Sequence, residues 1–444
     1  MTTSENSLSA FSDLLEDAET VPQPSPRRTR RTRIATISAI TAVALILGLA
    51  GAYVMWALEA PPPAPTLTAH TPPAPELEAT VIELPSSGAA AITVRGGRDF
   101  LGENGLQAAH GETEKRSIAS ITKLITALVV LDAYPIDGDG EGRRLTFDRA
   151  DHALYDEYYL RGATIARMPA GSSMSLRDAL SMLLVPSASN YADAVSTWAF
   201  GSRSGFVAAT RAWLAEHGLG DTTIVEPTGL DPDNTSTPRD LLALAEIAAA
   251  DPVIASIAAM ESISLPAPGL MYSTNGLLGI EGITGLKTGN LGRDSYNLLY
   301  TASVDVGTGE PLEVTGVVLG GYSRDTVDSS VLETIRSIRS GFRTVPVAEP
   351  GDRVGVAETA WGASTPLVVS EPASLFVWSD TAVSASIAVT DAARVGDTAG
   401  APAGTVTWEA GPRTATAPVT LEGDLEPPST WWRLTHPFEL LEAQ

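Results

Sequence analysis

The stretch Ile34–Leu58 contains no charged residue and is apolar almost throughout. A helix of about 20 such residues spans the hydrocarbon layer of a bilayer, so this segment predicts a transmembrane helix. Positive charges lie on one side only: arginines cluster between residues 27 and 33, and no lysine or arginine follows the stretch until Arg95. By the positive-inside rule, we expect residues 1–33 to lie in the cytoplasm and the rest of the chain to be exported.

A cleaved signal peptide is the alternative to a permanent anchor. Its apolar part is normally shorter and ends in small residues at a cleavage site, whereas here three prolines follow Ala60. We therefore predict an uncleaved single-pass protein of the cytoplasmic membrane, with its N-terminus inside and its main domain extracytoplasmic.

Composition divides the rest of the chain. Proline is frequent just after the predicted span, which is typical of a semi-rigid spacer, and short β-branched runs separated by Gly, Pro and Asp near the C-terminus predict strands. The predicted parts are a disordered cytoplasmic tail (1–33), a transmembrane helix (34–58), a Pro-rich linker (59–80), an enzyme-like domain (81–345) and a β-rich C-terminal domain (346–444).

Charge and residue usage exclude several classes of function. The formal net charge is −24 and belongs to the exported part, so nucleic acid is not an expected partner. Cysteine is absent, and the five histidines show no H-E-x-x-H or other close ligand spacing. A metal site, a thiolate nucleophile and a cofactor are therefore not expected.

Lysine is rare in this chain and stands in two short motifs. Only three of the 29 lysine and arginine residues are lysine; Lys123 ends Ser-Ile-Thr-Lys and Lys287 begins Lys-Thr-Gly. An arginine guanidinium cannot be deprotonated in a protein, whereas a crowded or desolvated lysine amine can serve as a base. The two lysines therefore predict a catalytic site.

These motifs resemble the S-x-x-K and K-T-G signature of penicillin-recognising serine acyl enzymes. The surrounding sequence resembles the D-alanyl-D-alanine carboxypeptidases, which are low-molecular-weight penicillin-binding proteins, from about Glu83 to Arg343. The segments that carry the resemblance are 119–127, 227–230, 273–278 and 285–289. It implies a serine carboxypeptidase that removes D-alanine from the pentapeptide of peptidoglycan, is acylated by β-lactam antibiotics and uses no cofactor.

The apolar patterns predict an α+β fold. Helices are expected at 118–131, 175–184, 191–199 and 332–340, and strands at 90–94, 286–288, 298–304 and 312–319. Helices that lie between early and late strands indicate an antiparallel sheet covered by helices. The resemblance implies the same arrangement, a penicillin-binding-protein/β-lactamase-like transpeptidase domain, followed here by a small all-β domain.

Ser120 and Lys123 are three residues apart in a predicted helix, so they share one face. The Lys123 amine can then take the proton of the Ser120 hydroxyl, which is a poor nucleophile without a base. Burial and a second ammonium group nearby both lower a lysine pKa, and Lys287 would be that second group.

Each residue of the K-T-G strand has a property suited to substrate binding. Lys287 supplies a positive field for a substrate carboxylate, the Thr288 hydroxyl can hydrogen-bond to it, and Gly289 lets the acyl chain approach the backbone. The resemblance implies that the backbone N–H groups of Ser120 and Asn290 bind the oxyanion. It also implies that Arg324 helps to hold the terminal carboxylate.

The middle motif departs from the family pattern Ser-x-Asn. Ser187 occupies the serine position, Ser189 stands where asparagine is expected, and asparagine follows one residue late as Asn190. A displacement of one residue usually turns a side chain away from the site. We take Ser187 as catalytic and both Ser189 and Asn190 as candidate substrate contacts.

Two other functions remain open. A class A-like serine β-lactamase uses the same motifs together with a deacylating glutamate, and Glu226 lies at a suggestive offset, although Glu226–Leu230 matches the carboxypeptidase sequence better. A degenerate homologue that binds cell-wall peptides without catalysis is the alternative that Ser189 suggests. The retention of Lys123 and Lys287 argues against it.

Overall fold

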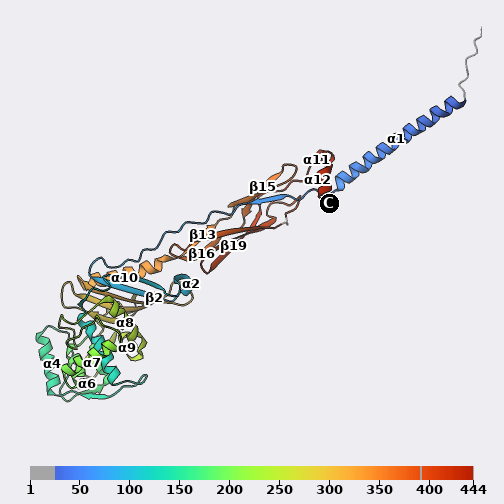
Figure 1. The fold of residues 1–444 in the computed structure, drawn as a ribbon. Helices are drawn as coiled ribbons and strands as arrows, with labels where there is room; N and C mark the ends of the chain where they lie inside the picture. The colour runs from blue at the N-terminus through green and yellow to red at the C-terminus, as the bar shows by residue number, and fades with distance from the viewer. Residues whose placement is uncertain (1–25, 391–392, 444) are drawn as a thin grey trace, which may run out of the picture.

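The computed structural model describes residues 26–390 and 393–443, and Figure 1 shows that these form an elongated molecule. Helix α1 (Pro26–Glu59) lies at one end, a β-rich part lies in the middle, and the largest body, which mixes helices and strands, lies at the other end. Helix α1 contains the predicted span 34–58 and has the length and composition of a membrane-crossing helix. Most of the tail predicted at 1–33 lies outside the described residues.

A five-stranded antiparallel sheet forms the centre of the large body. Its strand order is β10 (Ile283–Gly289), β11 (Tyr296–Val304), β12 (Leu312–Gly321), β2 (Ala89–Arg95) and β3 (Leu106–His110). Helix α10 (Arg324–Gly341) packs on one face, where Val331, Ile335 and Ile338 are buried against the sheet. Helices α8 and α9 pack on the opposite face. Strand β10, with its Lys-Thr-Gly sequence, lies at one edge of the sheet.

The helical part is built around α3, whose residues from Thr122 to Leu131 are all buried. Its helices are α3 (Thr122–Ala133), α4 (Arg149–Leu160), α5 (Leu176–Leu184), α6 (Ser189–Phe200), α7 (Arg203–Glu216), α8 (Pro238–Ala250) and α9 (Pro252–Ala258). The short elements are α2 (Arg98–Leu101), the 3₁₀ turns 119–121 and 280–282, and the strand pairs β4 (Arg116–Ser117) with β7 (Thr235–Ser236), β5 (Arg144–Thr146) with β6 (Ser173–Ser175), and β8 (Ser262–Leu265) with β9 (Gly269–Tyr272).

The predicted α+β class with an antiparallel sheet is confirmed. One helix differs in extent, because α10 begins at Arg324 rather than at Leu332. Ser323 and Thr326 form a capping box at its start, and such a cap fixes a helix end without any apolar periodicity. The first turns of α10 are polar, so the apolar pattern alone placed its start too late.

The C-terminal part is mainly β-structure, as predicted. A six-stranded sheet has the order β1 (Thr66–Ala69), β14 (Arg353–Glu358), β15 (Ser364–Val369), β19 (Arg413–Leu421), β18 (Pro402–Ala410) and β17 (Ser384–Val389), and a second ladder pairs β13 (Phe342–Ala348) with β16 (Ala373–Trp378). Trp408 lies fully buried in the core of this part. The predicted boundary after residue 345 falls within β13.

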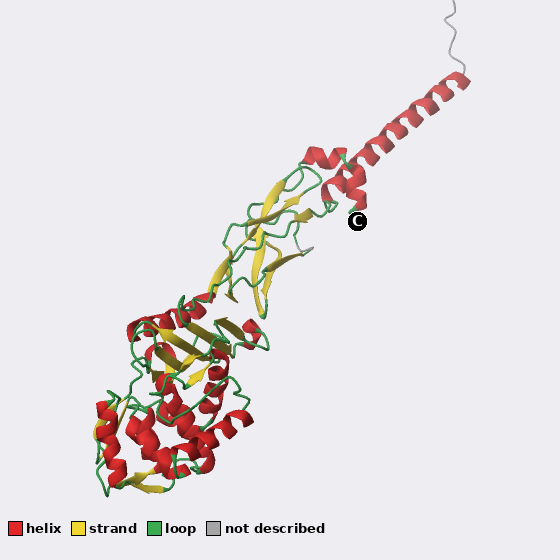
Figure 2. Cartoon of the chain, turned by 60° about the vertical axis from the view of Figure 1, so that its left-hand side comes forward, coloured by secondary structure: helices red, strands yellow, loops and turns green. Residues whose placement is uncertain are grey.

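Two features of this C-terminal part were not predicted. The Pro-rich segment expected as a spacer contributes β1, which pairs with β14 along the edge of the sheet. The chain ends in two short helices, α11 (Thr430–Thr435) and α12 (Pro437–Glu442), which Figure 2 shows beside the end of α1. The segment predicted as β-rich therefore ends in helices.

Candidate active site

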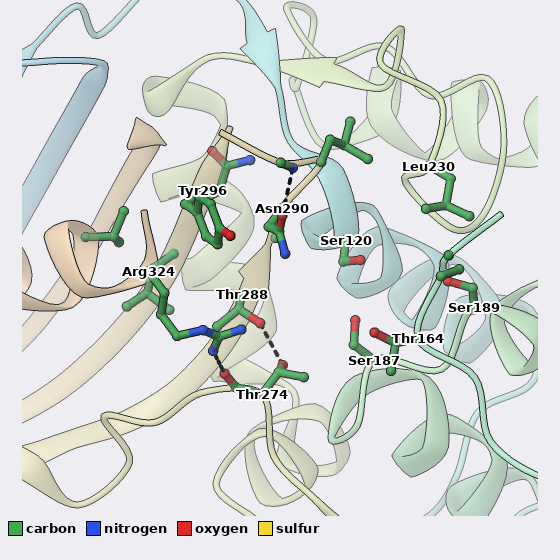
Figure 3. Close-up of a pocket in the computed structure, with 18 of the residues that line it drawn as sticks. Ser120, Thr164, Ser187, Ser189, Leu230, Thr274, Thr288, Asn290, Tyr296 and Arg324 are labelled. Carbon is green, nitrogen blue, oxygen red and sulfur yellow. Dashed lines mark hydrogen bonds between the residues drawn. The ribbon is translucent and has the colours of Figure 1, made fainter. Parts of the chain in front are cut away.

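A cleft with a volume of about 310 Å³ lies between the helical part and the end of β10. Figure 3 shows Ser120, Ser187 and Ser189 on one side of it, with Thr288 and Arg324 on the other. Its lining includes the predicted site residues Ser120, Ser187, Ser189, Thr288, Gly289, Asn290 and Arg324. Segments far apart in the sequence thus meet at one place.

Ser120 and Lys123 are in direct contact. The 3₁₀ turn Ala119–Ile121 carries Ser120, and Lys123 lies in the first turn of α3. Lys123 Nζ donates to Ser120 Oγ at 2.9 Å and to the Thr228 carbonyl oxygen at 2.6 Å. Burial lowers the pKa of Lys123 to about 7, while the Glu226 carboxylate opposes that change. Much of the amine is therefore uncharged near neutral pH, which is the state that a base requires.

Two non-glycine residues near Ser120 have an uncommon backbone conformation. Ala119 has φ +48° and Ser187 has φ +65°, a region that costs non-glycine residues about 1–3 kcal/mol each and that is found at functional sites. Gly229 lies against the first of these positions, because a Cβ there would be 1.9 Å from the Ala119 carbonyl oxygen. The surrounding loop therefore needs glycine to fix the turn that presents Ser120.

Lys287, on β10 beside the cleft residue Thr288, is fully buried. Its Nζ donates to the carbonyl oxygen of Thr288 at 3.0 Å. Burial holds its pKa well below the ordinary lysine value, and the charges of Lys123 and Arg324 act in the same direction. Burial is the largest cause of the lowered pKa of Lys123, as expected, and the two amines interact, since the charge of Lys123 also lowers the pKa of Lys287.

Close packing explains why position 289 is glycine, and the sequence did not reveal this packing. A Cβ at this position would approach the Ile118 carbonyl oxygen to 2.6 Å and the Ser120 nitrogen to 3.2 Å. The glycine therefore lets the end of β10 pack directly against the turn that carries Ser120. It also lines the cleft, so the predicted close approach of substrate remains compatible with its position.

Arg324 and Thr274 form the far wall of the cleft (Figure 3). Arg324 is the first residue of α10 and its guanidinium donates to the Thr274 carbonyl oxygen. The Thr274 and Thr288 hydroxyl groups lie 2.6 Å apart, within hydrogen-bond distance. Thr274 was not singled out as a site residue, although it lies in one of the segments that carry the family resemblance.

Asn190 is a correction to the predicted set. Its side chain donates to the Ala166 carbonyl oxygen at 2.8 Å and accepts from the Ala166 N–H at 3.1 Å, so it is fully engaged away from the cleft. Ser189, at the start of α6, lines the cleft, and the Asn190 amide does not reach the cleft beside it because it is bonded to Ala166. The displaced asparagine thus supports the backbone beside Thr164, which also lines the cleft and was not predicted.

Asn290 follows the strand and lines the cleft. Its side-chain Oδ1 accepts from the Gly292 N–H at 2.8 Å, which stabilises the turn after β10. The side chain therefore has a local partner, and any contribution of Asn290 to an oxyanion site would come from its backbone N–H group.

Glu226 is buried and faces its own loop rather than the cleft. One carboxylate oxygen accepts from the Thr228 N–H at 2.7 Å and the Thr228 hydroxyl at 2.6 Å. The other accepts from the Gly229 N–H at 2.5 Å and from Asn234 Nδ2 at 2.9 Å. A deacylating glutamate must reach a water in the cleft, and this one is occupied elsewhere, which argues against the β-lactamase alternative.

Comparisons with known proteins agree with this geometry. The family D-alanyl-D-alanine carboxypeptidase matches residues 105–322. A D-alanyl-D-alanine endopeptidase of Pseudomonas aeruginosa is 38% identical over 128 residues, which cover 29% of this chain and 38% of that protein. D-alanyl-D-alanine carboxypeptidase DacD of Salmonella typhimurium is 28% identical over 260 residues, covering 57% of this chain and 64% of that protein. The chain thus spans about two fifths to two thirds of the length of these relatives.

Penicillin binding protein 6B from Escherichia coli has a similar fold, with a TM-score of 0.51 at 20% identity over 75% of this chain and 95% of that structure. The resemblance drawn from the motifs is confirmed. Residues 105–322 match the D-alanyl-D-alanine carboxypeptidase family, and the fold is similar to that of a penicillin-binding protein.

Proposed function

We propose that this protein is a membrane-anchored serine D-alanyl-D-alanine carboxypeptidase that trims peptidoglycan stem peptides through an acyl-enzyme at Ser120. The observation that carries the proposal is the 2.9 Å contact between Ser120 Oγ and the buried Lys123 amine, on one side of a cleft whose opposite side carries the Arg324 guanidinium. A serine acyl enzyme requires this pairing of nucleophile and base.

The acylation step follows from these positions. Neutral Lys123 accepts the Ser120 hydroxyl proton while Oγ attacks the carbonyl carbon between the two D-alanine residues. The oxyanion forms near the backbone N–H groups of Ser120 and Asn290, and the C–N bond then breaks as the leaving D-alanine amine takes a proton back. In this proposal Ser187, which lines the same cleft, passes that proton. Water then hydrolyses the ester and restores Ser120.

Substrate recognition is assigned to the opposite wall. The leaving D-alanine ends in a carboxylate, and the exposed Arg324 guanidinium lies beside the Thr274 and Thr288 hydroxyl groups. Charge-assisted hydrogen bonds of this kind are about twice as strong as neutral ones. The cleft thus has a nucleophile at one end and a carboxylate-binding group at the other. The same serine would be acylated by penicillin, because a β-lactam carries a reactive carbonyl group and a carboxylate in one molecule.

An endopeptidase that cuts cross-links is a second candidate, because a relative at 38% identity carries that name. Purified full-length protein in detergent should be incubated with pentapeptide monomers and with cross-linked dimers. The proposal expects release of D-alanine from monomers and little conversion of dimers. Efficient conversion of dimers to monomers, absent from Ser120→Ala, would assign the endopeptidase instead, and no reaction with either substrate would overturn the proposal.

The anchor belongs to the same proposal. Helix α1 carries exposed apolar side chains along its length, and the arginines before Ile34 favour a cytoplasmic N-terminus. Protease added to intact protoplasts should therefore remove the ectodomain and leave a short membrane-bound fragment. Survival of the ectodomain, under conditions that digest a control exported protein, would show the opposite orientation.

A further inference from the structure

Figures 1 and 2 show the C-terminal helices beside the end of α1, and a small apolar cluster joins them. Ala57, Ala60 and Leu440 are buried in it, and side chains of α1 and α11 pack around them. Tyr53 Oη donates to the Leu434 carbonyl oxygen at 2.7 Å. The two ends of the chain, separated by the whole ectodomain in sequence, therefore meet where α1 ends.

Arg433 on α11 binds the carbonyl groups at the end of α1. Arg433 Nη1 donates to the Ala60 carbonyl oxygen at 2.7 Å and approaches the carbonyl oxygens of Leu58 at 3.3 Å and Ala57 at 3.4 Å. The last carbonyl groups of a helix have no partner within the helix, and a cation there interacts favourably with the helix dipole. The last turn of α1 has no basic residue of its own, so α11 supplies its cap.

The depth of the junction follows from the length of α1. A helix rises about 1.5 Å per residue, so about 20 residues cross a hydrocarbon layer of about 30 Å. Counted from the charged boundary at Arg33, that distance ends near Tyr53. Tyr and Trp are enriched at the membrane surface, and Tyr53 and Trp56 occupy that level. Helices docked on this part of α1 must lie at the outer surface of the bilayer.

The same helices expose large apolar side chains. Trp431 and Phe438 are each 75% exposed and Leu441 is 54% exposed, all within a short terminal segment. On α1, the exposed side chains of Met55 and Leu58 lie next to the junction. Exposed apolar side chains thus lie on both α1 and the helices docked at its end, which favours lipid as the occupant rather than a soluble partner.

We propose that α11 and α12, clasped to the end of α1, form a membrane foot that inserts Trp431, Phe438 and Leu441 into the outer leaflet between headgroups and acyl chains. The foot rests on the proposed membrane crossing of α1 and does not depend on catalysis at Ser120. It gives the ectodomain a second contact with the bilayer, from the opposite end of the chain, so that the ectodomain does not swing freely on one helix.

The absence of cysteine allows a direct test. Phe438→Cys, in the full chain, is labelled with a nitroxide and placed in nanodiscs of phosphatidylglycerol and phosphatidylcholine. Collision with oxygen, which concentrates in lipid, is compared with collision with a water-soluble nickel chelate. Leu45→Cys, in the middle of α1, reports the lipid interior, and Tyr272→Cys, an exposed aromatic position on β9, reports water. Trp431→Cys provides a second reading of the foot.

The expected ratio of oxygen to nickel collisions for both foot positions lies between those of the two reference positions, and several-fold above that of Tyr272→Cys. Water-like values at Phe438 and Trp431, with lipid-like values at Leu45, would overturn the foot while leaving the anchor intact. Water-like values at Leu45 would overturn both. Protection from both reagents at the foot would show a protein contact instead of lipid. Unchanged penicillin labelling of each variant checks that the ectodomain is folded.

Discussion

Lys123 and Glu226 are joined through a single residue of the loop between α7 and β7. The Thr228 carbonyl oxygen accepts from Lys123 Nζ, while the N–H and hydroxyl groups of Thr228 donate to the Glu226 carboxylate. The carboxylate therefore fixes the group that positions the base, and its charge raises the pKa that burial lowers. In the proposed mechanism, the balance between these two effects sets the pH above which Lys123 can act as the base.

Acylation by penicillin should consequently increase with pH across neutrality. Only the neutral amine of Lys123 accepts a proton, and its pKa of about 7 divides the charged form below that pH from the reactive form above it. Stopped-flow rates with a fluorescent penicillin should reach half of their plateau near pH 7. A half-maximum near the ordinary lysine value would show that the amine is not desolvated in the working enzyme.

Glu226→Gln should move that midpoint to lower pH. Removing the negative charge removes the effect that favours protonated Lys123, while burial continues to favour the neutral amine. Glu281→Gln is the matched control, because Glu281 pairs with Arg336 and Arg339 on α10 and is not among the groups that shift the pKa of Lys123. An unchanged midpoint, in a variant that melts as the wild type does, would contradict the coupling.

Local patterns predicted four of the five sheet strands, four helices of the large body and the meeting of the two lysine motifs, because each rests on apolar periodicity or on a short motif, whereas β3, α4, α7, α8 and α9 were not predicted. Contacts between distant segments were not predictable in this way. The close approach of Gly289 to Ile118, the engagement of Asn190 with Ala166 and the docking of α11 on α1 each join parts of the chain that no periodicity connects. The start of α10 was not predicted correctly because a cap, rather than an apolar pattern, defines it.

Ser120→Ala should abolish covalent penicillin labelling, since no other atom in the proposed mechanism forms the ester. Lys123→Arg should reduce labelling severely, because arginine keeps a positive charge and cannot accept the proton. Mass spectrometry of the labelled peptide identifies the acylated residue. Lys115→Arg, at an exposed lysine paired with Asp221, is the matched control and should label normally. Persistent labelling of Ser120→Ala would disprove the assignment.

Gly229→Ala should slow acylation more than it affects the rest of the protein. The added Cβ would lie 1.9 Å from the Ala119 carbonyl oxygen, and φ of +81° disfavours alanine as well. The turn that presents Ser120 must therefore shift. Gly218→Ala is the control, since Gly218 has a similar φ of +71° and open space around it. Equal acylation rates for the two variants would show that the turn tolerates displacement.

Substitutions at Ser189 and Asn190 should have different effects, on the rate of acylation and on the stability of the fold respectively. An asparagine at 189 would add polar contacts to charged groups, each worth about 1.5–3 kcal/mol, which corresponds to about one to two orders of magnitude in rate if they act in the transition state. Ser189→Asn should therefore accelerate penicillin acylation and peptide hydrolysis, with little effect on the melting temperature.

Asn190→Ala should behave differently, because it leaves the buried N–H and C=O groups of Ala166 without partners. Each unsatisfied group costs about 1–3 kcal/mol, so the free energy of unfolding should decrease measurably in denaturant titrations. Any loss of acylation should follow from that instability and should recover at lower temperature. If Ser189→Asn is inert while Asn190→Ala abolishes acylation without destabilising the fold, then Asn190 is the working amide, and the loop adopts another register when substrate binds.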